Sequence, residues 1–218
     1  MGNPMPDTGR ILLEIACGSI HDAVLADQAG ADRLELCSAM ELEGLTPSLG
    51  TAFEVAARLD TPFVAMVRPR AGHFLCSSTE LSVMERDVSL LLEAGASGVV
   101  FGCLTSGGQV DVKSCRRLLR AAGGNETVFH PVETVFHRAF DKVGDQLSAL
   151  EVLIDLGITR VLTSGGAPTA LEGVAKIRAL VEHAEGRIEI LPAGGIREHN
   201  VEAVVKQTGC TQVHLSRR

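Results

Sequence analysis

The chain has 218 residues, enough for one domain with a large core, and its 45% hydrophobic and 22% charged residues exclude a disordered polymer. The net charge of −7, with acidic residues scattered along the chain, excludes the basic surface that a nucleic-acid-binding protein needs. No apolar run reaches the roughly 18 residues that span a bilayer, and residues 1–10 lack the apolar core of a signal peptide. We therefore expect a cytoplasmic protein with a flexible N-terminus at residues 1–10, and neither nucleic acid nor membrane as a partner.

Apolar segments of strand length recur along the chain, and amphipathic helical patterns separate them. Several helical patterns end in glycine just before the next apolar segment, where glycine supplies the left-handed conformation of a helix C-cap. Eight such alternations indicate an α/β fold, a (β/α)8 TIM-type barrel, and the first turn lacks the G-x-G-x-x-G loop of dinucleotide-binding sheets. We expect one barrel domain over residues 11–218, with strands at 11–17, 33–37, 63–68, 98–104, 134–139, 160–164, 187–193 and 212–215.

The string E-T-V-F-H occurs twice, at residues 126–130 and 133–137, with Pro131 and Val132 between the copies. Only one copy can form the fifth strand, and proline is disfavoured inside a central strand. We assign the strand to the second copy because it leads directly into Arg138 and Asp141. Residues 126–132 are then a short duplicated insertion.

The sequence ends at Arg218, shortly after the last predicted strand, and leaves no residues for an eighth helix. A parallel barrel that lacks its final helix has part of its outer face uncovered. We therefore expect an exposed apolar surface, a partner chain in a homo-dimer or homo-tetramer, or a truncated product.

Charged residues inside the predicted strands indicate what faces the barrel interior, because alternate strand residues point inward. Glu14, Glu35, Cys37, Arg68 and His137 share that face and are expected to gather near the carboxyl-end rim. Buried charges must pair or bind a ligand, so we expect Arg68 to neutralise Glu14 or Glu35. The cluster is either an ion-pair network that only orders the barrel or a functional site, and barrel sites lie at this rim.

Glycine-rich turns follow the sixth and seventh strands, and arginines lie on the neighbouring rim. Backbone N–H groups in such turns approach an anion closely, and guanidinium groups bind carboxylate or phosphate in pairs of hydrogen bonds. The alternative is that these residues form tight turns and nothing more. The expected anion-binding residues are Arg70, Arg138, Ser164, Gly165, Gly166, Gly194 and Gly195.

Several longer strings resemble the CutC family of copper homeostasis proteins, over roughly residues 11–216. The resemblance implies a (β/α)8 barrel, a cytosolic and often oligomeric protein, and a role in copper handling. It also implies copper binding by cysteines that end the first two strands, here Cys17 and Cys37. His73 and Cys76 depart from the family, which usually has an acid and an aromatic residue there. The matching strings are G-A-D-R-L-E-L-C-S at 30–38, G-L-T-P-S-L-G at 44–50, R-P-R at 68–70, V-F-G at 100–102, F-H-R-A-F-D at 136–141, L-T-S-G-G at 162–166 and A-L-E-G at 170–173.

Three functional interpretations follow from these residues. In the first, the protein serves copper homeostasis by binding Cu(I), which favours soft thiolates, through Cys37 and with Cys17. Cys37 is the better candidate, because Cys17 points outward if Glu14 points inward; the alternative is that the Cys37 thiol is buried and inert. In the second, an enzyme of lyase or isomerase type abstracts a proton from a small anionic metabolite. Its catalytic residues would be Glu35, His137, Arg68, Glu14 and Asp141.

The third interpretation is a degenerate barrel that serves as an interaction scaffold, which the missing final helix favours. The polar residues of the rim are mainly acids, arginines and one histidine rather than thiols. That composition favours the enzyme, whereas the family resemblance favours copper.

Overall fold

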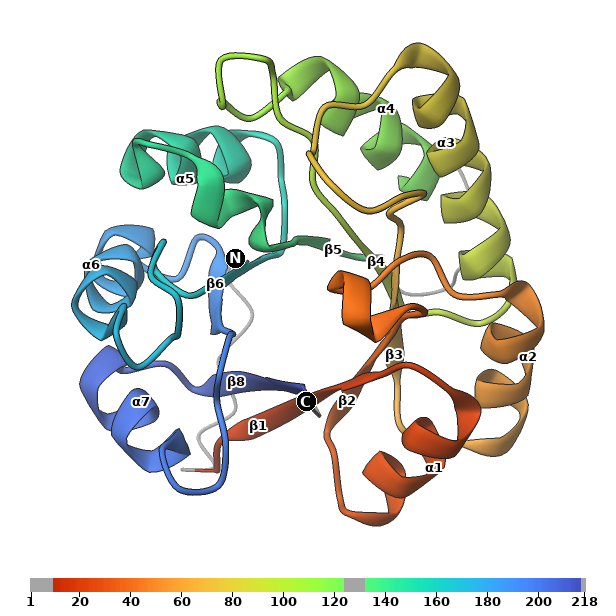
Figure 1. Cartoon of the computed structure of the whole chain (residues 1–218), viewed down its shortest axis with the longest axis horizontal. Helices are drawn as coiled ribbons and strands as arrows, with labels where there is room; N and C mark the ends of the chain where they lie inside the picture. Colours follow the sequence, from red (N-terminus) through yellow and green to blue (C-terminus); the bar gives the residue numbers. More distant parts are fainter. Residues whose placement is uncertain (1–9, 124–131, 217–218) are drawn as a thin grey trace.

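The computed structural model describes residues 10–123 and 132–216 of the chain. Its parallel strands form one sheet in the order β7-β6-β5-β4-β3-β2-β1-β8, and β8 also lies against β7. The sheet therefore curls into a nearly closed barrel with the helices arranged around it (Figure 1). The strands are β1 (Leu12–Cys17), β2 (Arg33–Leu36), β3 (Phe63–Met66), β4 (Gly98–Phe101), β5 (Glu133–Phe136), β6 (Arg160–Thr163), β7 (Glu189–Pro192) and β8 (Gln212–Ser216).

Helices cover the outside of the barrel, and polar side chains fix where several of them begin. The side chains of Ser19, Ser48 and Asp145 each accept a backbone N–H of the following first turn. Ser77 and Glu80 form a reciprocal capping box. The helices are α1 (Ile20–Gln28), α2 (Leu49–Arg58), α3 (Ser78–Glu93), α4 (Val112–Gly123), α5 (Gln146–Asp155), α6 (Val174–Ala184) and α7 (Val201–Thr208), with 3₁₀ turns η1 (Met40–Leu42) and η2 (Arg138–Lys142).

The expected (β/α)8 barrel is confirmed, and each predicted strand overlaps an observed one. The second E-T-V-F-H copy forms β5, so the assignment of the fifth strand is confirmed. The first copy, and with it most of the proposed insertion at 126–132, lies outside the described residues. The N-terminal segment 1–10 also lies outside them, apart from Arg10.

Apolar side chains pack into two layers, one outside the barrel wall and one inside it. The outer layer fills the space between strands and helices and contains most of the buried hydrophobic residues, such as Leu34 and Phe101. The inner layer is small and includes Val64, Val100 and Leu191. Strands β2, β3, β4 and β6 are buried along their whole length, as expected for a parallel barrel.

The outer face of β1 and β8 is less well covered than that of the other strands. Leu13, Ile15 and Leu215 are half-buried, whereas Leu34 of the neighbouring β2 is fully buried. The last element that the structure describes is β8. None of the exposed large hydrophobic residues of the described chain lies on β1 or β8, so an exposed apolar surface beside the last strand stays a prediction.

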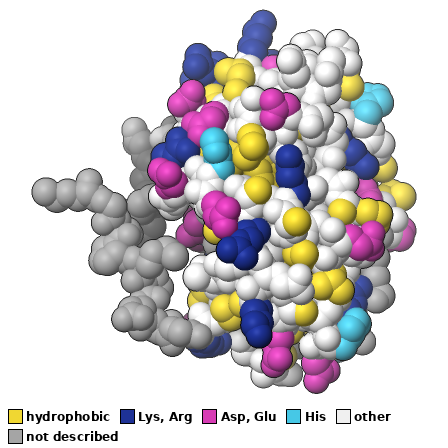
Figure 2. Space-filling model, turned by 90° about the vertical axis from the view of Figure 1, so that its left-hand side faces the viewer, with side chains coloured by type: hydrophobic (Ala, Val, Ile, Leu, Met, Phe, Trp, Pro, Cys, Tyr) yellow, Lys and Arg dark blue, Asp and Glu magenta, His cyan; other side chains and the backbone are white. Residues whose placement is uncertain are grey.

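The surface carries charges of both signs, mixed with scattered apolar side chains on the face that Figure 2 shows. In the described part of the chain, no helix combines the length and the apolar character that a membrane crossing requires.

Candidate functional site

A cavity of about 440 Å³ opens where the strands end. Loops that follow the strands form its walls, and side chains that point into the barrel form its floor. Sites in barrels of this kind lie at the carboxyl ends of the strands. Inward-pointing polar side chains from four strands or their ends reach the cavity, namely Glu35, Cys37, Arg68, His137 and His214.

Below the cavity, Glu14 of β1 is fully buried between two partners. Arg33 of β2 donates from Nε to Glu14 Oε2 at 2.5 Å, and His214 of β8 donates from Nδ1 to Glu14 Oε1 at 2.7 Å. Arg33 also donates from Nη2 to Gln212 Oε1 at 2.9 Å. An ionised carboxylate only accepts hydrogen bonds, so the proton in the contact with His214 belongs to Nδ1.

These contacts determine the protonation states of Glu14 and His214. Burial alone would raise the pKa of Glu14, but the hydrogen bond and charge of His214, with the charges of Arg33 and Arg160, lower it to about 2. Burial alone would lower the pKa of His214, but the carboxylates of Glu35 and Glu14 raise it. Glu14 is therefore ionised, and His214 holds its second proton more strongly than a free imidazole does.

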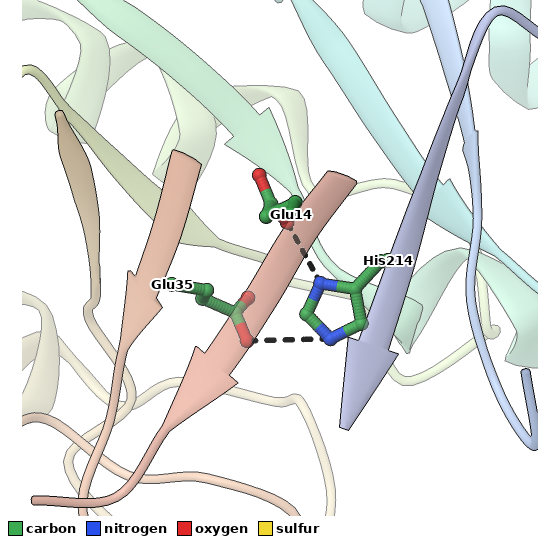
Figure 3. Close-up of side chains that lie close together, drawn as sticks. All are labelled: Glu14, Glu35 and His214. Atoms are coloured by element: carbon green, nitrogen blue, oxygen red, sulfur yellow. Dashed lines mark hydrogen bonds and ion pairs between the residues drawn. The ribbon is translucent and has the colours of Figure 1, made fainter. Parts of the chain in front are cut away.

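Glu35 of β2 lies on the other side of the same imidazole (Figure 3). Its Oε2 is 3.7 Å from His214 Nε2 and 3.5 Å from Cys37 Sγ, and its Oε1 is buried without a partner among the described residues. Burial raises the pKa of Glu35, and the negative charge of Glu14 adds to this against the opposing charge of His214. Glu35 is thus a buried carboxyl group that holds a proton more strongly than an exposed glutamate does, and one of its oxygens has no partner among the described residues.

Arg68 does not pair with Glu14 or Glu35, so that expectation is wrong. Its Nη1 donates to the carbonyls of Leu42 at 3.0 Å and Gly44 at 3.2 Å, and its Nη2 donates to the carbonyl of Gly72 at 3.2 Å. The guanidinium also lies 5.2 Å from the ring centroid of Phe74. Arg68 therefore connects the loop that contains η1 to the loop after β3. The buried positive charge that neutralises Glu14 comes instead from Arg33, its neighbour on β2.

Replacement of Arg68 by methionine is expected to lower the free energy of unfolding by about 1–3 kcal/mol, because several loop carbonyls lose their donor. Urea denaturation at neutral pH measures this loss. Arg58→Met is the control, since the exposed pair of Arg58 with Glu54 should contribute little. An Arg68 variant as stable as the Arg58 variant would show that these bonds do not hold the loops.

His137 follows β5 and lies against Phe74, with 4.9 Å between the ring centroids. Its Nδ1 accepts the backbone N–H of Ala139 at 3.1 Å, so Nε2 carries the proton. Burial and the nearby charge of Arg68 lower the pKa of His137 to about 3. His137 is therefore neutral, and it can offer a hydrogen bond from Nε2 to a ligand.

Both carboxylate oxygens of Asp141 accept hydrogen bonds, mainly from the end of β6 and the turn that follows it. Its Oδ1 accepts from Thr163 Oγ1 at 2.6 Å and from the Gly166 N–H at 3.1 Å. Its Oδ2 accepts from Ser164 Oγ at 2.9 Å and from Arg138 Nε at 2.8 Å. Asp141 therefore accepts the backbone N–H groups of Ser164 and Gly166, which the sequence suggested for an anion.

The turn after β7 differs, because in the described residues no side chain occupies its backbone N–H groups. In the described chain, no acceptor is found for the backbone N–H groups of Gly194 and Gly195, and both residues line the cavity with φ angles of +100° and +69°. A Cβ on Gly194 would lie 3.2 Å from Arg138 Nη1, so the guanidinium sits directly against this turn. Arg138, Gly194 and Gly195 therefore line the same part of the cavity wall.

Two other residues of the expected anion site lie elsewhere. Arg70 pairs with Glu80 and donates to the carbonyl of Leu75 at 2.7 Å, and it does not line the cavity. Gly165 lies against α6, and its N–H donates to Oγ1 of Thr163, the last residue of β6, at 2.9 Å.

Comparison with known proteins supports the resemblance seen in the sequence. A family model described as the CutC family matches residues 11–218. A CutC family protein of Treponema denticola is 49% identical over 207 residues, which are 95% of this chain and 81% of that protein. The chain belongs to the CutC family.

Other CutC proteins agree with this assignment. The copper homeostasis protein cutC homolog of Homo sapiens is 42% identical over 207 residues, covering 95% of this chain and 73% of that protein. The crystal structure of a CutC protein from Streptococcus agalactiae matches with a TM-score of 0.87 at 33% identity, over 95% of this chain and 99% of that one. The names of these relatives connect the CutC family to copper homeostasis.

The two cysteines that the CutC resemblance implies as copper ligands lie on opposite faces of the barrel wall. Cys37 belongs to the inner layer and lines the cavity. Cys17 belongs to the outer layer, and burial raises its pKa to about 12, with the charges of Asp22 and Glu35 adding to the effect. The structure therefore brings Cys37 to the site and leaves Cys17 outside it.

Sequence reasoning missed His214, the residue that joins the two carboxylates in this CutC chain. The signal was present in β8, where Val213 and Leu215 alternate with Gln212 and His214. Gln212 and His214 therefore point inward, as Glu14 does on the paired strand β1.

Proposed function

We propose that this chain takes part in copper homeostasis by binding Cu(I) in the cytosol, with Cys37 as the anchoring ligand. The observation that carries the proposal is a group of sulfur atoms on one wall of the cavity. Cys37 and Met66 belong to the same inner layer, Met40 packs against it, and all three line the cavity. A Cβ on Gly44 would lie 3.2 Å from Cys37 Sγ and 3.6 Å from Met66 Cε, so these two side chains are neighbours.

Thiolate and thioether ligands favour Cu(I) over harder metal ions. The six cysteines are free thiols, which fits a reducing compartment such as the cytosol. Homo-oligomer formation stays a prediction beside this proposal.

The carboxyl group beside Cys37 supplies a route for the proton that Cu(I) displaces. Burial and the charge of Glu35 raise the pKa of the Cys37 thiol, so the thiol is protonated before the metal arrives. The S–H donates to Glu35 Oε2 at 3.5 Å. As the Cu–S bond forms, the proton passes to this carboxylate, whose own pKa burial raises. Cu(I) affinity is therefore expected to depend on Glu35 as well as on the sulfur ligands.

Anaerobic competition against a colorimetric Cu(I) chelator tests the proposal. Cys37→Ser should lose one equivalent of tight binding, and Glu35→Gln should weaken that equivalent by about 10–100-fold. Cys17→Ser is the matched control, since Cys17 is equally buried but lies outside the cavity. Unchanged binding in Cys37→Ser, or a loss only in Cys17→Ser, would contradict the proposal.

A second function, an enzyme of lyase or isomerase type acting on a small anionic metabolite, is favoured by one specific observation. Arg138 and the turn at Gly194 can bind an anion in the cavity that Glu35 also lines, and Glu35 Oε1 has no partner among the described residues. Glu35 would then abstract the proton, with His214 beside it.

Thermal unfolding with a panel of small carboxylates and organic phosphates tests this function. A panel member should raise the melting temperature of the native chain and have a smaller effect on Arg138→Gln. Lys142→Gln, at the cavity rim, is the comparison for a general loss of positive charge. A panel without any stabilising member would count against the enzyme.

A further inference from the structure

Glu14, Glu35 and His214 form a buried group with the dimensions of a metal site at the floor of the cavity. Each residue offers one ligand atom, and these atoms lie within 4.8 Å of one another. The three residues come from the adjacent strands β1, β2 and β8, and Figure 3 shows their side chains converging. Glu35 and His214 also line the cavity, so a ligand can reach them from there.

We propose that Glu35 and His214 bind a divalent transition-metal ion of the zinc class, with Glu14 orienting the imidazole. The metal ligands are the Glu35 carboxylate and His214 Nε2, and water from the cavity completes the coordination. The proposal goes beyond the Cu(I) site at Cys37 and does not rest on it.

The separation of the two ligand residues fits a shared metal ion better than a direct hydrogen bond. Glu35 Oε2 lies 3.7 Å from His214 Nε2, which is too long for a hydrogen bond between nitrogen and oxygen. Two ligand atoms that are each about 2.1 Å from one Zn²⁺ ion are about 3.4 Å apart in a tetrahedral site. A small movement of either side chain therefore gives the spacing that zinc requires.

A second observation, independent of this spacing, is the state of the other Glu35 oxygen. Glu35 is 4% exposed, and its Oε1 has no hydrogen-bond partner in the described part of the chain. A buried polar atom without a partner costs free energy, and most such atoms in folded proteins are paired. A cation bound by the Glu35 carboxylate satisfies this oxygen.

Glu14 completes an arrangement that is common around metal-bound histidines. A ligating imidazole usually donates its other ring N–H to a carboxylate, which fixes the tautomer and the orientation of the ring. Here His214 Nδ1 donates to Glu14 Oε1 at 2.7 Å, and Arg33 holds the other Glu14 oxygen. The lone pair of Nε2 is thereby directed toward Glu35. Metal binding displaces any proton on Nε2 to solvent and involves no oxidation or reduction.

The ligand types select the class of metal. Imidazole nitrogen suits Zn²⁺ and its neighbours in the first transition series, whereas Mg²⁺ and Ca²⁺ prefer oxygen ligands throughout. Cu(I) prefers the sulfur ligands on the Cys37 side of the cavity. One imidazole and one carboxylate, with water in the open positions, resemble a catalytic zinc site more than a closed structural one.

Calorimetric titration of the full chain with Zn²⁺ alone tests the site, in a Cys37→Ser background that removes the thiol beside Glu35. One equivalent should bind, and adding Glu35→Gln or His214→Asn should weaken it by about 100-fold. The asparagine amide can still donate toward Glu14, so His214→Asn removes mainly the Nε2 ligand. Glu43→Gln, which neutralises another acid of the cavity lining, is the matched control and should bind as the background does. Equal binding in all these variants would overturn the proposal.

Anomalous diffraction at the zinc edge, from crystals of the native chain soaked in Zn²⁺, provides a readout that needs no variant to fold. A peak bonded to His214 Nε2 and the Glu35 carboxylate is expected. Zinc found only at surface histidines or at thiols would overturn the site. The two metal proposals fail separately, because the Cu(I) site is excluded if Cys37→Ser keeps its Cu(I), and the Zn²⁺ site is excluded if His214→Asn keeps its Zn²⁺.

Discussion

Replacement of Arg33 by methionine is expected to lower the free energy of unfolding by about 3–5 kcal/mol at neutral pH, because it leaves a buried charge without its partner. The carboxylate of Glu14 is 1% exposed and pairs with Arg33 Nε at 2.5 Å. Arg33 also satisfies the buried Gln212 amide oxygen, so its removal leaves a second polar group unpaired. Urea denaturation at neutral pH measures the loss.

Two further variants separate the pair from general effects of removing arginine. Arg178→Met removes an arginine whose pair with Glu182 is exposed, and the unfolding midpoint should be unchanged. The double variant Glu14→Gln, Arg33→Met should be more stable than Arg33→Met alone, because no unpaired charge remains in the barrel. If the double variant is the less stable one, Glu14 is not the group that Arg33 neutralises.

Acid is expected to remove about 3 kcal/mol of stability through Glu14 alone, since its pKa is lowered from 4.5 to about 2 by its partners. The unfolded chain binds the proton first, so this contribution is fully present above pH 4.5 and is lost as the pH falls through 2. The raised pKa of His214 acts in the opposite sense, and its contribution is lost as the pH rises above the folded value.

Denaturation curves for the native chain and Glu14→Gln, recorded from neutral pH downward, test this effect. The difference in stability between the two proteins should shrink steadily below pH 4.5. His21→Gln is a suitable control because His21 is an exposed residue far from the barrel interior. A difference that stays constant through this acid range would mean that Glu14 is not held ionised in the fold.

The alternation of apolar strands and amphipathic helices was sufficient to predict the barrel, because each strand of a parallel sheet is buried on both faces. The same periodicity placed Glu14, Glu35, Cys37 and His137 on the inner face, which the structure confirms. The periodicity does not identify the residue that pairs with the Glu14 carboxylate, because this depends on the register between neighbouring strands. Glu14 lies beside Arg33 on β2 and beside His214 on β8, and His214 is 200 residues away in the sequence.

The sequence could only partly predict which glycine-rich turn keeps its backbone N–H groups without an internal partner, for a related reason. A glycine-rich turn after a strand indicates available backbone N–H groups, but the sequence does not show which of them an internal group already occupies. Asp141 fills that role at the turn after β6, whereas Gly194 and Gly195 face the cavity. Met40 likewise packs against the inner layer that contains Cys37, and this contact depends on how η1 is placed after β2.

The most direct test of Cu(I) binding in the cavity is anomalous diffraction at the copper edge from crystals of the Cu(I)-loaded chain. A copper peak is expected beside Cys37 and Met66, inside the cavity. The peak should be absent in Cys37→Ser crystals grown and loaded in the same way. A cavity without copper, or copper held only by Glu35 and His214 away from Cys37, would contradict the account.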